Sequence, residues 1–113
     1  MIELVDPSKN YEIKHPDGAV FVMAHWTVAM QDEVDSKCIA RDAQGRATYL
    51  LPLERELKIE MALRDWRGVG SEGAELPCTP ENKRKLPVGV LLWLLQEIDE
   101  RAGLRIRDSE KKT

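Results

Sequence analysis

The sequence contains few cysteines and histidines, which limits the metal and redox chemistry that it can support. Its 113 residues include two cysteines, Cys38 and Cys78, and two histidines, His15 and His25. Two isolated cysteines are too few for a disulfide framework, so we expect reduced thiols. Neither the cysteine pair nor the histidine pair has the short ligand spacing of a structural zinc site. We therefore predict no metal and no cofactor.

The sequence also lacks an apolar run of membrane-spanning length. Residues 88–95 carry no polar side chain, but a bilayer-spanning helix needs roughly 18 to 20 such residues. Residues 1–5 have neither the basic region nor the long apolar region of a signal peptide. We therefore predict no membrane association and a cytoplasmic location.

Basic residues are in slight deficit over the whole chain. Lys and Arg number 17 against 20 Asp and Glu, for a formal net charge of −3. Four of the basic residues and two of the acidic ones lie in residues 105–113, so the rest of the chain is distinctly acidic. An acidic body argues against nonspecific binding of nucleic acid, and we predict no nucleic-acid partner.

Length and composition predict a single α+β domain over residues 1–104, followed by a basic, disordered tail over residues 105–113. Near its start, the turn sequence HPDG at residues 15–18 separates two short stretches, 11–14 and 19–23. Proline and glycine there suit a tight turn, so we predict an N-terminal β-hairpin. Thr27 can cap a following helix that runs to about Asp42.

Residues 53–64 fit two different secondary structures. Apolar and charged side chains alternate over most of this segment, which favours one further strand. The alternative is a helix, because the segment is rich in helix-forming residues and part of it also has helical spacing. The residues with helical spacing are Leu50, Leu53, Leu57 and Met61. We predict a strand.

The sequence predicts that the chain is organised around an apolar C-terminal helix over residues 87–102. Thr79 and Pro80 favour a short helical turn before it, and Pro87 can open the helix itself. Gly103 can end it, with Leu104 folding back onto the last turn. With this helix, the sequence predicts two to three helices in all.

No face of residues 88–95 is suited to water, because eight residues turn more than twice around a helix. Val90, Trp93 and Leu94 lie opposite the side that carries Leu91 and Leu95. We predict that Val90, Trp93 and Leu94 contact a protein partner or a second copy of the chain, with Trp93 as the main contact. The alternative is that both sides of the helix are buried within the domain.

Motifs for catalysis are weak, and we predict no enzymatic activity and no catalytic residue. Gly68, Gly70 and Gly73 match the spacing of a dinucleotide-binding loop, but prolines occupy the place of the helix that such a loop requires. We predict a structural turn there. The remaining alternative is a small enzyme or ligand-binding module that uses His15 and Asp17 together with His25.

Residues 64–98 carry a pattern of turn-forming and capping residues followed by an apolar helix. The residues of this pattern are Trp66, Gly68, Val69, Gly73, Pro77, Thr79 and Glu81. With this pattern, the stretch resembles the small tail assembly chaperones of long-tailed bacteriophages and prophages. These residue types make it a structural signature and not a catalytic one.

The resemblance implies a non-enzymatic protein that binds the tape measure protein during tail assembly. An apolar helix or groove is suited to a long, largely helical client, which offers amphipathic surfaces. The alternative within phage morphogenesis is another small structural protein, such as a head-tail connector or completion protein.

Overall fold

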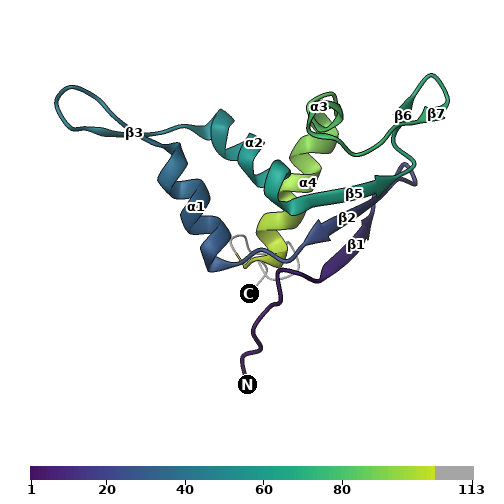
Figure 1. Cartoon of the computed structure of the whole chain (residues 1–113), viewed down its shortest axis with the longest axis horizontal. Coiled ribbons are helices and arrows are strands. Elements are labelled where there is room, and N and C mark those ends of the chain that lie inside the picture. Colours follow the sequence, from purple (N-terminus) through teal and green to yellow (C-terminus); the bar gives the residue numbers. More distant parts are fainter. Residues whose placement is uncertain (104–113) are drawn as a thin grey trace, which may run out of the picture.

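The computed structural model describes residues 1–103, so the predicted tail (residues 105–113) and the predicted contact of Leu104 lie outside the described residues. The described chain is an α+β domain, as predicted (Figure 1). Its strands are β1 (Asn10–Lys14), β2 (Val20–Ala24), β3 (Ile39–Arg41), β4 (Ala47–Tyr49), β5 (Leu63–Arg67), β6 (Gly70–Ser71) and β7 (Ala74–Glu75). Its helices are α1 (Val28–Cys38), α2 (Leu51–Ala62), α3 (Pro80–Lys83) and α4 (Val88–Arg101).

The predicted N-terminal hairpin is confirmed and supplies two strands of an antiparallel sheet with the order β1-β2-β5. The backbone amide of His15 donates to Ala19 O, and the amide of Gly18 donates to His15 O. Gly18 has a φ of 96°, a conformation that is strained for residues with a Cβ. The turn sequence therefore sets the register that pairs Lys14 with Val20.

The first helix begins as predicted, but it ends earlier. Thr27 is its N-cap and its side chain accepts a hydrogen bond from the Met30 amide. The expected end near Asp42 is wrong, because β3 starts directly after Cys38 and pairs with β4 in a second hairpin. The Tyr49 hydroxyl donates to Asp35 Oδ1 at 2.9 Å, which ties this hairpin to α1. Figure 1 shows the β3-β4 hairpin projecting from the body of the molecule.

The predicted strand over residues 53–64 is wrong, because most of this segment belongs to α2. Pro52 lies in the first turn of α2, and Glu54 pairs with Lys58 one turn later at 3.1 Å. The helix packs against α1, α3 and α4 as well as β2. It therefore accommodates apolar side chains on several sides. In the sequence, this arrangement produces the alternation of apolar and charged residues that suggested a strand.

The further strand of the sheet is β5, which begins where α2 ends. Its pairing with β2 shifts register between Val22 and Met23, so that Arg64 is an extra residue on β5. This irregularity allows Leu63 and Trp66, three positions apart, both to be buried in the core. The guanidinium of Arg64 donates instead to Pro7 O at 2.9 Å.

The glycine-rich segment forms the short β6-β7 hairpin, which agrees with a structural turn. Beyond it, Thr79 caps α3 by accepting from the Asn82 amide at 3.1 Å, as predicted. The apolar C-terminal helix is also confirmed: Pro87 immediately precedes α4, and Gly103 follows it with a positive φ of 77°. After β7, the chain therefore leads through α3 to the start of α4.

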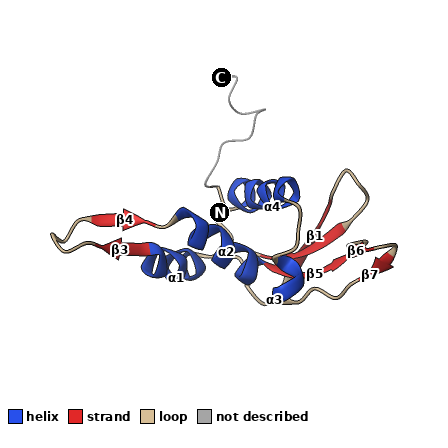
Figure 2. Ribbon diagram, turned by 90° about the horizontal axis from the view of Figure 1, so that it is seen from above, coloured by secondary structure: helices blue, strands red, loops and turns tan. Residues whose placement is uncertain are grey.

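The core lies between the sheet, α2 and α4. Figure 2 shows α4 lying over the layer that is formed by the sheet, α2 and α1. The buried cluster draws on all of these elements except α1. Its members are Ile13, Phe21, Met23, Ile59, Ala62, Leu63, Trp66, Leu94 and Ile98.

Candidate functional site

Of the three residues predicted to contact a partner, Leu94 is wrongly assigned. Its side chain is 0% exposed and belongs to the core cluster together with Ile98. The error has a simple cause, because the sequence shows that α4 is apolar all round but not which side the sheet covers. Leu94 stabilises the domain and is not accessible to a partner in the folded chain.

Trp93 and Val90 are half-buried and pack against the core cluster. The indole ring of Trp93 meets the His15 ring edge-on, with 4.7 Å between ring centroids, and lies 6.1 Å from the Phe21 ring. Aromatic pairs of this geometry contribute to folding stability. Much of the Trp93 surface is therefore already used inside the domain, which limits it to a partial role in any contact.

The exposed apolar side of α4 is formed by different residues. Val88 is 70% exposed and Leu92 is 47% exposed, one helical turn apart. Leu92 and Leu95 line a groove of about 290 Å³ together with Leu51 of α2, which is also exposed. We call this feature the α2-α4 groove. Its polar lining consists of Glu54, Arg55, Lys58, Gln96 and Asp99.

The charges in the α2-α4 groove are largely paired within the chain. The buried ammonium of Lys58 lies 2.9 Å from Asp99 Oδ1 and 3.1 Å from Glu54 Oε1, so it links α2 to α4. Burial favours the neutral form of Lys58, but the hydrogen bonds with Asp99 and Glu54 outweigh it and raise the pKa of Lys58. The groove therefore presents leucines to a ligand beside an internally paired cluster of one ammonium and two carboxylates.

A second hollow, with a volume of about 350 Å³, lies where α3 and α4 meet α2, and Arg55 lines both hollows. Its lining includes Ile59, Leu86 and Leu91, but Arg84 and Glu56 form an ion pair at 3.2 Å on its rim. None of these apolar side chains is among the exposed large hydrophobic residues. The α2-α4 groove is therefore the better candidate for a protein contact.

The residues of the alternative enzymatic hypothesis do not form one cleft. His15 lies beyond the Lys14–Val20 end of the hairpin, whereas His25 follows Ala24 at the opposite end. The Nδ1 atom of His15 accepts a hydrogen bond from the Asp17 amide at 3.1 Å, so it serves the turn. His25 lies beside Tyr11, with 5.0 Å between their ring centroids. His15 and His25 therefore cannot act together on one substrate.

Other chemistry in the described chain is equally limited. Residues 1–103 contain no group of three or more His, Cys, Asp or Glu side chains placed to hold a metal ion. Cys38 is a buried free thiol and Cys78 a half-buried one, and burial raises the pKa of both. Among the same residues, no helix combines the length and the apolar character that crossing a bilayer requires.

The residues that carry the family resemblance have structural roles. Trp66 is buried and its indole N–H donates to Leu76 O at 2.7 Å, while Gly68 and Gly73 adopt positive φ angles in the turns around β6 and β7. Thr79 caps α3. Together these residues bring the chain from β5 to the start of α4.

Comparison of the chain with known protein families, with curated proteins and with solved structures gives no match. The candidate site therefore rests on the geometry of the α2-α4 groove.

The sequence analysis did not identify Leu51 and Leu92 as exposed residues of the groove. Leu51 was placed before a predicted strand, and Leu92 lies in a helix whose sides the sequence does not distinguish. The feature of the sequence that could have identified Leu92 is the helical spacing of Val88, Leu92 and Leu95, which places them on one side of the helix.

Proposed function

We propose that this chain is a non-enzymatic, cytoplasmic morphogenesis factor of a bacteriophage or prophage tail, a tail assembly chaperone that binds the tape measure protein. The client segment is an amphipathic helix that lies in the α2-α4 groove. The observation that carries the proposal is the pair of exposed leucines, Leu51 and Leu92, in one groove. Clustered exposed apolar side chains are typical of protein contact sites, and a helix-in-groove contact uses such a surface.

The resemblance over residues 64–98 supports the same function. Its residues shape the turn and cap that deliver the chain to α4, the helix that forms one wall of the groove. The structural role of the motif and the position of the groove are thus connected through one continuous segment. The predicted contact through Val90 and Trp93 becomes secondary, since both residues already pack on the core.

Co-expression with a phage tape measure protein tests the proposal. We expect the two proteins to co-purify and Leu92→Asp to weaken the complex by about 30-fold or more, because a central interface residue contributes roughly 2 kcal/mol or more. Val28→Asp is the matched control, since Val28 is an exposed apolar residue on α1, away from the groove.

Two outcomes would contradict the proposal. Failure of the parent chain to bind any segment of the tape measure protein would remove the client. Equal weakening by Val28→Asp and Leu92→Asp would remove the groove as the binding site. Co-purification with a head-tail junction protein instead would favour the connector or completion role.

A further inference from the structure

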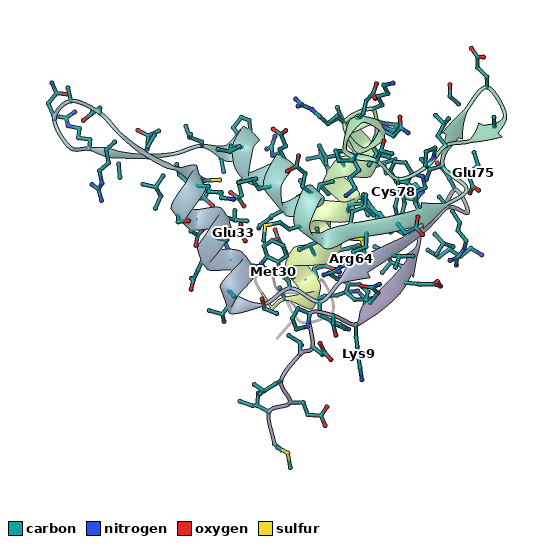
Figure 3. All side chains as sticks on the ribbon, in the orientation of Figure 1. Lys9, Met30, Glu33, Arg64, Glu75 and Cys78 are labelled. Carbon is teal, nitrogen blue, oxygen red and sulfur yellow. The ribbon has the colours of Figure 1, made fainter. Side chains whose placement is uncertain are left out.

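The N-terminal segment, residues 1–5, carries apolar side chains that nothing in the folded chain covers. Ile2 is 94% exposed and Leu4 is 97% exposed, and Met1 and Val5 are exposed as well. Figure 3 shows the side chains of this segment standing away from the rest of the molecule. We call residues 1–5 the N-terminal arm.

The arm is free only up to a defined point. Arg64 donates to Pro7 O at 2.9 Å, and Asp6 Oδ1 accepts from the Ser8 amide at 2.9 Å, just before β1 begins. The chain is therefore tied to β5 at Pro7 and leaves the body from there, as Figure 1 shows. Four large apolar side chains in water favour association with another apolar surface.

The α2-α4 groove has the length and the chemistry to receive the middle of this arm, residues 2–4. Three extended residues span about 10 Å at a rise of roughly 3.3 Å each. The part of α4 that lines the groove, from Leu92 to Asp99, also spans about 10 Å, at 1.5 Å per residue. The groove contributes Leu51, Leu92 and Leu95 along that length.

Charge complementarity points the same way. Glu3 is the one charged side chain of the arm, and Arg55 lines the groove. Within residues 1–103, neither side chain has an oppositely charged partner at ion-pair distance, whereas Glu54, Lys58 and Asp99 are paired with one another. An arm in the groove can place Glu3 against Arg55.

We propose that two copies of this chain form a symmetric dimer in which each N-terminal arm binds the α2-α4 groove of the other copy. In the isolated chain both the arm and the groove remain uncovered, and reciprocal exchange covers both at once. A twofold arrangement makes the two contacts identical and leaves no unpaired arm. The arm and the proposed client would occupy the same groove, so the dimer is the form of the chain that has no client bound. The inference does not depend on the identity of the client.

The proposal is tested by measuring the mass of the chain in solution by light scattering and sedimentation over a range of concentrations. The chain carries its purification tag at the C-terminus, so that the tag does not cover the arm. We expect a dimer for the parent chain and for the control Val28→Asp. Leu4→Asp and Leu92→Asp should each weaken the dimer by about 30-fold or more and leave the circular dichroism spectrum unchanged. Both side chains are exposed in the single chain, so neither change should unfold it.

Mixing the two variants separates arm exchange from other modes of association. The Leu92→Asp chain keeps an intact arm and the Leu4→Asp chain keeps an intact groove, so the mixture should form a heterodimer through one arm-groove contact. Neither variant alone should form a dimer at the same concentration. The reversals Glu3→Arg and Arg55→Glu should each weaken the dimer roughly threefold, as an exposed ion pair does, and their combination should restore it.

A monomeric parent chain, or a dimer that survives Leu4→Asp or Leu92→Asp, would overturn the proposal. Absence of the heterodimer in the mixture would do so too. The Leu4→Asp chain also separates this inference from the proposed function, because its groove remains intact for a client. Failure of the Leu4→Asp chain to bind the tape measure protein would contradict the function alone, and a parent chain that binds this protein but stays monomeric in its absence would contradict the dimer alone.

Discussion

At the scale of single residues, Trp66 shows how one side chain can define a boundary between segments. Its indole ring is buried on β5, and its N–H donates to a carbonyl on the far side of the β6-β7 hairpin. It therefore holds the glycine-rich segment against the sheet.

Trp66→Ala should cost about 3 to 5 kcal/mol of folding stability, because it removes a large buried ring and leaves the Leu76 carbonyl without its donor. Chemical denaturation followed by circular dichroism measures this loss. Trp66→Phe is the control, since it keeps most of the apolar volume and loses the hydrogen bond, and it should cost less. An alanine variant as stable as the parent chain would show that the ring contributes no packing.

At the scale of elements, α4 has two apolar sides with different roles. Leu94 and Ile98 face the core, whereas Val88 and Leu92 are exposed beside the α2-α4 groove. A pattern of hydrophobic residues cannot separate these sides when every position is apolar. The position of the sheet decides which side of α4 is buried and which side is exposed.

The same substitution at two neighbouring positions measures that difference. Leu94→Ala should destabilise the domain by about 2 to 5 kcal/mol, because it leaves a cavity in the core. Leu92→Ala should cost under about 1 kcal/mol, because the side chain is half in water in the isolated chain. Denaturation midpoints at low protein concentration, where self-association is negligible, provide the measurement. Equal costs would mean that α4 does not pack in the orientation described.

At the scale of the whole molecule, the two layers are joined by a charged contact as well as by the core. Lys58 lies in α2 and Asp99 in α4, and their contact is partly buried in the lining of the α2-α4 groove. Removing a buried charge from such a cluster is destabilising, since the remaining carboxylates lose their counter-charge. The ion pair therefore contributes to the orientation of the two helices that form the groove.

Lys58→Met should cost about 1 to 3 kcal/mol at neutral pH, less than for a fully buried pair, because Glu54 and Asp99 keep some contact with water. Lys37→Met is the control, since Lys37 forms an exposed pair with Glu33 and should cost under about 1 kcal/mol.

The pKa of Lys58 is raised above its ordinary value of 10.5, so its stabilisation is fully present below pH 10.5 and declines as the pH rises through the folded-state pKa. The difference in unfolding free energy between the parent chain and Lys58→Met should shrink over that range. A difference that is constant from neutral pH to above pH 10.5 would contradict a charged contact.

The N-terminal half of the sheet and the ends of the helices could be predicted because local chemistry decides them. Pro16 and Gly18 set the first turn, Thr27 and Thr79 cap helices, and Gly103 follows the last one. The segment 53–64 could not be predicted in the same way. Its alternating pattern suggested a strand, but its helix-forming composition prevailed once α2 could pack on several sides.

The sequence by itself determined the α+β class, the first hairpin, the capped starts of α1 and α3, and the presence of an apolar C-terminal helix. Each of these depends on residues that are close together in the chain. Only the tertiary structure decided that Leu94 is core and Leu92 is exposed, that Leu51 lines the same groove, and that the N-terminal arm is uncovered. These features depend on which distant segment covers which side chain, and that is set by packing of the whole chain.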